Sequence, residues 1–104
     1  MARYDVYQNP HAPERRHTPY VIDVQNDHLG PLDTRIVIPL RSKQFLPRPT
    51  EALNPVLEVD GKWVVLDTAS MAPVPTSMLR RPVMRATPFA GDVADALDTL
   101  FGVF

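Results

Sequence analysis

Cysteine is absent from this sequence of 104 residues, so the chain can form neither a disulfide nor a thiolate metal site. No apolar run is long enough to cross a bilayer, and the first residues lack the apolar core of a secretion signal. A large excess of one charge is also absent, because 11 basic and 12 acidic residues leave a net charge of -1. Such a chain has no global field that attracts a polyphosphate. These absences predict a soluble cytoplasmic protein and disfavour nucleic acid as a direct partner.

Glycine is scarce and proline is plentiful, with four and 12 residues. Proline lacks an N–H donor and has a fixed φ, so each proline belongs at a strand edge, a strand end, a turn or a helix start. Prolines spread through the chain therefore argue for short strands and against a helical bundle. A chain of this length is expected to form one domain, residues 1–104, around a single core.

Motifs that carry chemistry are also missing. There is no Gly-x-Gly-x-x-Gly sequence or P-loop, and no serine stands in the Gly-x-Ser-x-Gly setting of a nucleophile elbow. Asp23 and Asp27 are expected to accept hydrogen bonds from loop amides rather than to act as an acid/base pair. The histidines fall in expected loops, without the spacing of a zinc site, and are His11, His17 and His28. We expect no metal and no cofactor, and the residues alone favour an interaction protein over an enzyme.

Two apolar segments indicate the fold. Val21–Asp27 alternates apolar and polar positions, whereas Thr34–Leu40 is apolar almost without interruption. They predict strands over Pro19–Gln25 and Arg35–Leu40, joined by a tight surface loop within one compact sheet.

Further strands are expected on either side of this pair. Arg3–Gln8 alternates as a first strand. Val56–Val59 and Lys62–Leu66 flank Asp60-Gly61, a two-residue turn that accepts positive φ, and together they predict a β-hairpin. Ala72–Met78 resembles a strand, but its two prolines remove two ladder donors and place it at an edge or beside a bulge.

The last segment changes to a helical period. Thr87 is expected as the N-cap, and Pro88 as the first helical residue. Apolar residues then recur at helical spacing, at Phe89, Val93, Leu97, Leu100, Phe101 and Phe104. One amphipathic helix therefore ends the predicted fold.

Two loops carry local positive charge. Asn9–Thr18 is polar and cannot bury a face, so it is expected as an exposed loop or projecting hairpin, of the kind that often carries binding function. Its Arg15 and Arg16 are either solvated charges or contacts to a partner. A second basic cluster consists of Arg80, Arg81 and Arg85. It is read as a solvated loop rather than a nucleic-acid patch, because no aromatic side chains are interleaved with these arginines.

Several motifs in order resemble the CcdB family of gyrase-poisoning toxins. They are similar to its Val-Asp-Val-Gln-x-Asp and Arg-x-Val-Ile-Pro-Leu strands, its central hairpin, its Met-Ala-x-Val-Pro edge and its closing helix. The matching stretches are Val21–Asp27, Arg35–Leu40, Leu53–Val56, Lys62–Trp63, Asp67–Pro75 and Ala96–Phe101. The resemblance covers nearly the whole chain, and several motifs in order are far more specific than any one of them.

The resemblance implies a mostly β fold with a C-terminal α-helix. It would be a small SH3-like barrel with a main antiparallel sheet and a small projecting sheet near the N-terminal loop. It also implies a homodimer that acts as the toxin of a toxin–antitoxin pair. In the family the toxin binds the A subunit of DNA gyrase and traps the cleaved-DNA complex. A partly disordered, CcdA-like antitoxin neutralises it and with it represses the operon, so operator DNA is reached only through the antitoxin.

The resemblance also assigns contact residues. Gyrase contacts come from the end of the helix and a neighbouring loop, which here are His28, Leu29, Asp98, Phe101, Gly102, Val103 and Phe104. The antitoxin is expected against the projecting loop and the neighbouring edge strand, at Arg15, Arg16 and Val74. The family pattern ends Phe-Trp-Gly-Ile, whereas this tail reads Phe101-Gly-Val-Phe104 and lacks the tryptophan. Phe104 either folds back onto the core or is displayed to a partner, and the resemblance favours display.

Two other functions stay open at this point. Toxins of the same barrel include messenger-cleaving endoribonucleases, which would need a basic groove and a positioned acid/base pair. The near-neutral charge and the lack of an obvious pair weigh against this alternative. The chain could also be a non-toxic relative that only binds antitoxin.

Overall fold

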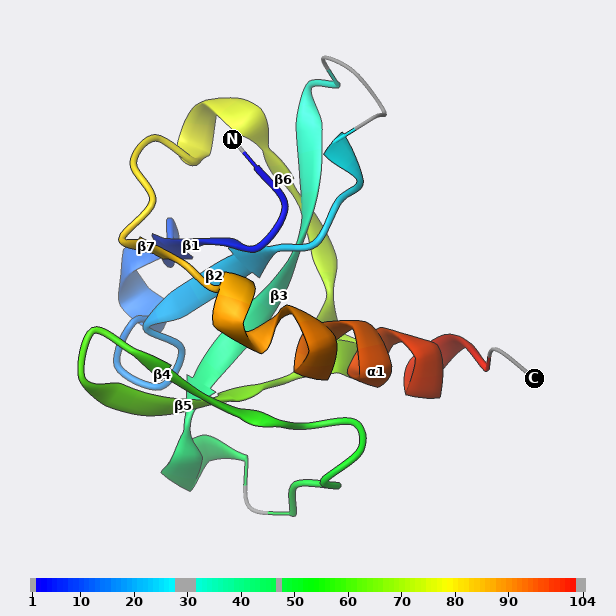
Figure 1. The fold of residues 1–104 in the computed structure, drawn as a ribbon. Coiled ribbons are helices and arrows are strands. Elements are labelled where there is room, and N and C mark those ends of the chain that lie inside the picture. Colours follow the sequence, from blue (N-terminus) through cyan, green and yellow to red (C-terminus); the bar gives the residue numbers. More distant parts are fainter. Residues whose placement is uncertain (1, 28–31, 47, 103–104) are drawn as a thin grey trace.

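A computed structural model describes residues 2–27, 32–46 and 48–102 (Figure 1). The strands are β1 (Asp5–Gln8), β2 (Tyr20–Asp23), β3 (Thr34–Ser42), β4 (Val56–Val59), β5 (Lys62–Leu66), β6 (Ala72–Pro75) and β7 (Met84–Arg85). The α-helix is α1, Ala90–Phe101. Short 3₁₀ turns lie at Ala12–Glu14, Lys43–Phe45, Thr68–Ser70, Thr76–Met78 and Thr87–Phe89.

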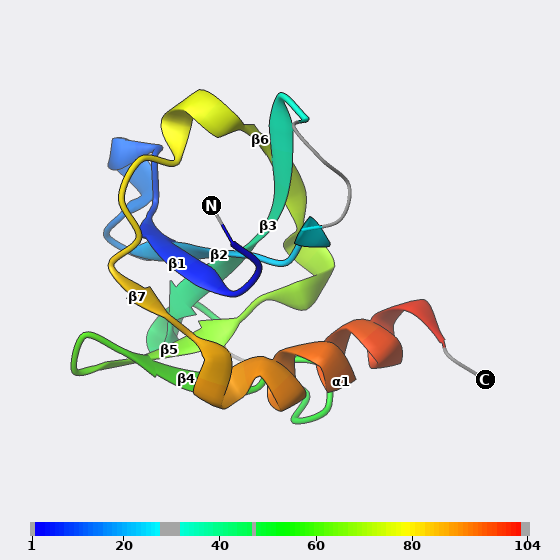
Figure 2. The same cartoon turned by 45° about the horizontal axis from the view of Figure 1, so that its top comes forward.

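All strand pairs are antiparallel, and the strands follow one another in the order β4-β5-β3-β2-β1-β7. The sixth strand, β6, lies off this path and pairs with the first half of β3, while β5 pairs with its end. The part of the sheet formed by β6 and the start of β3 projects beyond the rest and is continuous with it (Figure 1). Figure 2 shows the strands curling around a common interior, with α1 across one side. The expected barrel with a C-terminal helix is confirmed.

Local sequence chemistry accounts for most of these elements. The turn between β4 and β5 has φ of 51° at Asp60 and 78° at Gly61, as a two-residue hairpin turn requires. The proline-containing strand β6 pairs only with β3 among the described strands and is therefore an edge strand, as predicted. The predicted strands around Val21 and Ile38 pair directly, with Ile22 opposite Ile38.

The N-terminus of the helix differs from the prediction. Thr87 does not cap α1, because Thr87–Phe89 forms a 3₁₀ turn and the helix proper begins at Ala90. No side chain caps either the turn or the helix by a hydrogen bond. Pro88 does occupy the first turn, where a missing N–H costs nothing. None of the helices in the described ranges has the length and apolar character of a membrane span.

The core has two parts, one on each face of the sheet. The larger part fills the barrel and includes Val93 and Ala96 of α1 packed on the inward-facing strand residues. The smaller part lies on the outer face and consists of Tyr7, Val21, Val37 and Leu79, with Val74 packed against it. Leu79 and Val74 pack on this outer face, and Asp23 and Gln25, the polar residues of the alternation that point to it, are buried as well. The alternation in Val21–Asp27 therefore does not mark a solvent-exposed face.

Candidate functional site

The end of α1 lies beside the end of β2. Leu97 and Phe101 of the helix, together with Val24, Gln25, Asn26, Ile36 and Met71, line a cleft of about 320 Å³. Asn26 stands just before the segment that holds His28 and Leu29. The fold therefore brings the helix end to the base of the loop that the resemblance also assigns to gyrase binding. His28, Leu29, Val103 and Phe104 lie outside the described residues.

Of the residues that the resemblance assigns to gyrase binding, the structure describes Asp98, Phe101 and Gly102, which lie at the C-terminal end of α1. Phe101 is 70% exposed, the largest value among the exposed large apolar side chains of the described residues. Asp98 is exposed one turn earlier, and its carbonyl accepts a hydrogen bond of 2.8 Å from the Gly102 N–H. Gly102 has φ of 71°, the left-handed conformation that favours glycine and ends a helix. The helix thus stops directly after a displayed aromatic side chain.

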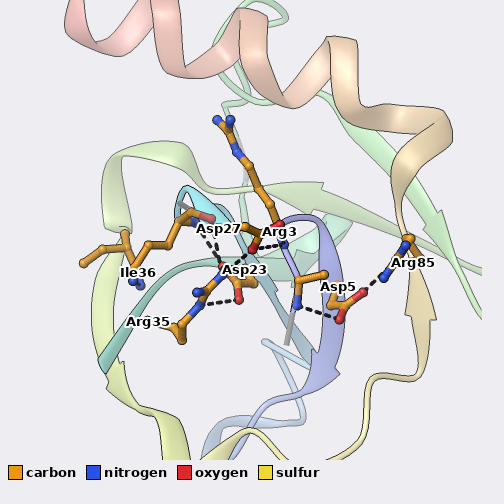
Figure 3. A network of polar contacts seen from close by, with 9 residues as sticks. Arg3, Asp5, Asp23, Asp27, Arg35, Ile36 and Arg85 are labelled. Atoms are coloured by element: carbon orange, nitrogen blue, oxygen red, sulfur yellow. Dashed lines mark hydrogen bonds and ion pairs between the residues drawn. The ribbon is translucent and has the colours of Figure 1, made fainter. Parts of the chain in front are cut away.

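A buried ion pair joins β2 and β3, the strands beside the residues that line the cleft opposite the helix (Figure 3). Arg35 of β3 donates to both carboxylate oxygens of Asp23 of β2, at 2.7 and 3.0 Å. The side chains are 8% and 0% exposed. The Asp23 carboxylate also accepts the Gln25 N–H at 2.9 Å, and Asp23 raises the pKa of Arg35 further above its ordinary value. Both charges stay paired inside the protein.

The same network holds the base of the loop. The Asp27 carboxylate accepts from Arg35 Nη2 at 3.2 Å and from the Arg3 N–H at 3.0 Å. The Gln25 side-chain carbonyl accepts the Ile36 N–H at 3.0 Å. The chain is therefore anchored through Asp27, one residue before His28. Both aspartates do accept backbone amides, as predicted, but sequence reasoning missed Arg35, whose only signal was a cation within an apolar strand.

Polar pairs continue across the outer face of the sheet. Arg85 of β7 donates to the Asp5 carboxylate at 3.3 Å (Figure 3). Asp5 and Tyr7 are two residues apart in β1, so they share this face of the strand. The Tyr7 side chain is buried, and its hydroxyl interacts with the Asp5 carboxylate. Burial, and then the carboxylates of Asp5 and Asp23, raise the pKa of Tyr7 to about 12.

We expect this tyrosine to make the fold sensitive to alkali. In the unfolded chain the Tyr7 hydroxyl loses its proton near pH 10, whereas in the folded protein the hydroxyl keeps its proton up to about pH 12. Deprotonation therefore favours unfolding, and this group alone should lower the free energy of unfolding by roughly 2–3 kcal/mol between those values. Urea titrations at several pH values should show Tyr7→Phe losing less stability than the parent chain over this interval. Parallel losses in the two proteins would contradict the assignment.

Two of the three expected antitoxin residues, Arg15 and Val74, lie on the outer face. Val74 lines an apolar hollow, Arg15 lines the adjoining hollow, and Pro10 and Met78 line both. Arg15 is held in place because its Nε donates to the Asn9 carbonyl at 2.6 Å. Arg16 is exposed and lines neither hollow. The loop of residues 9–18 is thus partly packed, and its ends Asn9 and Thr18 are buried.

Comparison with known proteins identifies a related family. The family model described as CcdB protein matches residues 3–102. A search of curated proteins finds no significant match.

Proposed function

This chain belongs to the CcdB family and is a toxin of a toxin–antitoxin pair, and we propose that it binds the A subunit of DNA gyrase and traps the enzyme on cleaved DNA. The observation that carries the proposal is Phe101, an aromatic side chain 70% exposed at the helix end and beside the anchored base of the loop. Aromatic side chains in such positions are common anchors of protein interfaces. The toxin would act in the cytoplasm by binding, without a catalytic group of its own.

The contact surface would comprise both segments that meet at the cleft. Asp98, Phe101 and Gly102 supply the helix end, and His28 and Leu29 continue from the segment held by Asp27. Val103 and Phe104, which follow the helix in the sequence, would also belong to this surface. We propose that Phe104 supplies the apolar area that tryptophan supplies in the family pattern.

We also propose that the toxin is a homodimer. Leu100 is only partly buried, so the end of α1 leaves apolar area beside Phe101 that a second copy could cover. Equilibrium sedimentation at micromolar concentration should give the mass of a dimer, and a monomer alone would contradict this part of the proposal.

The antitoxin is proposed to be an acidic, flexible chain that folds on the outer face, at Arg15, Arg16 and Val74. Operator DNA would then be bound by the antitoxin, with the toxin held on it in the repressor complex.

A cleavage assay tests the proposed target. Gyrase and supercoiled plasmid incubated with the protein should accumulate linear DNA after denaturation of the enzyme, because the cleaved complex is held. A matched incubation with messenger RNA, without gyrase, tests the endoribonuclease alternative. RNA fragments without linear plasmid would favour that alternative. Neither product, together with normal growth of cells that express the chain alone, would indicate a non-toxic relative.

A further inference from the structure

Two adjoining hollows on the outer face differ in chemistry. The first, here called the apolar hollow, has a volume of about 380 Å³, with Val21, Val37 and Pro39 among its lining residues and β6 along it. The second, the arginine hollow, has a volume of about 290 Å³ and is lined by Tyr7, Gln8, Pro10, Arg15, Met78, Arg80 and Arg81. Since Pro10 and Met78 line both hollows, the two form one groove.

The arginine hollow carries charge that the described residues do not neutralise. Arg80 and Arg81 are exposed and form no ion pair with a described residue, and the Nε of Arg15 is directed to a backbone carbonyl. No carboxylate lines this hollow, whereas the apolar hollow has one, Glu14. A ligand that carries negative charge at one end would therefore complement the groove.

The backbone of β6 restricts how a ligand can bind beside it. The Thr76 N–H donates to Asp33 across the ladder, and N–H directions alternate along a strand, so Ala72 and Val74 face β3 in the same way. The outward positions are then Pro73 and Pro75, which have no N–H. A partner strand would find acceptors but no donors along this edge. Recognition must depend on side chains in the groove rather than on an added β-strand.

We infer that the groove docks an extended peptide that places apolar side chains in the apolar hollow and carboxylates in the arginine hollow. This inference rests on the proposed function, because the peptide would be a segment of the antitoxin. It goes further by stating the chemistry of that segment: an apolar stretch next to an acidic one, read by Arg15, Arg80 and Arg81. Arg80 and Arg81 thereby become specificity residues rather than solvated loop charges.

Charge exchange with synthetic peptides tests the groove. The probe is the labelled peptide Leu-Val-Leu-Val-Gly-Ser-Glu-Glu-Glu. A second, basic peptide has lysines in place of its three glutamates. The acidic peptide should bind the native protein at least tenfold more tightly than the basic one, and more weakly as salt rises. The double variant Arg80→Glu/Arg81→Glu should reverse this preference. The matched control Lys43→Glu/Arg48→Glu makes the same charge change at exposed positions that line neither hollow and should keep the preference.

Equal binding of both peptides, an unchanged preference in Arg80→Glu/Arg81→Glu, or no binding of the acidic peptide at concentrations on the order of 1 mM would overturn the inference. The gyrase assay keeps this failure separate from failure of the proposed function, since the groove shares no lining residue with the cleft at Phe101. A protein that traps gyrase but ignores the acidic peptide refutes the groove alone. A protein that binds the peptide but never traps gyrase refutes the proposed target alone.

Discussion

Phe101→Ala is expected to weaken gyrase binding by on the order of thirtyfold while leaving the fold nearly unchanged. The side chain is 70% exposed, so its removal takes little packing from the core. An exposed aromatic anchor instead buries its area in a partner, where truncation commonly costs about 2 kcal/mol or more. Titration of linear DNA formation against toxin concentration measures the loss, and thermal unfolding measures the fold.

The matched control is Trp63→Ala. Trp63 lies in β5, is 56% exposed and lines none of the cleft at the helix end. This variant should leave gyrase trapping intact, so a loss in both variants would point to a general effect of removing surface aromatics.

Deletion of residues 103 and 104 should abolish trapping and preserve antitoxin binding. If the deletion variant still traps gyrase, the tail is not part of the contact surface.

Asp23→Ala is expected to lower the free energy of unfolding by about 3 to 5 kcal/mol. The substitution leaves the Arg35 guanidinium, 8% exposed, without its bidentate partner. The contacts that remain, to the Asp27 carboxylate at 3.2 Å and to the Gln25 carbonyl at 3.3 Å, are longer and do not replace the lost bidentate pair. Urea unfolding, with the midpoint and slope both fitted, measures the change.

Two further variants separate charge from packing. Arg85→Ala breaks a pair in which the arginine is 61% exposed, and it should cost at most about 1 kcal/mol because solvent screens that pair. The double change Asp23→Ala/Arg35→Met removes both charges and should recover much of the loss seen in Asp23→Ala. A double variant as unstable as Asp23→Ala would mean that the lost hydrogen bonds, not the stranded charge, dominate.

Local patterns were sufficient for most of the fold. The period of apolar residues predicted the strands around Val21 and Ile38 and the final helix, and Asp60-Gly61 predicted the hairpin. The prolines predicted that β6 lies at an edge or beside a bulge, and the structure places it at an edge. These features depend on dihedral angles and side-chain alternation within a few residues, which a sequence displays directly. The N-cap prediction at Thr87 failed because the chain enters α1 through a 3₁₀ turn instead.

Sequence patterns alone predicted the strands, the hairpin turn and the helix, and several motifs in order predicted the family. Three features became visible only in the folded protein: Arg35 neutralises Asp23, Phe101 is displayed beside the base of the loop, and Arg15, Arg80 and Arg81 line one hollow. Each of these features brings together residues from different parts of the chain. Their distances depend on strand register and on the curl of the sheet, which are properties of the packed whole rather than of any local segment.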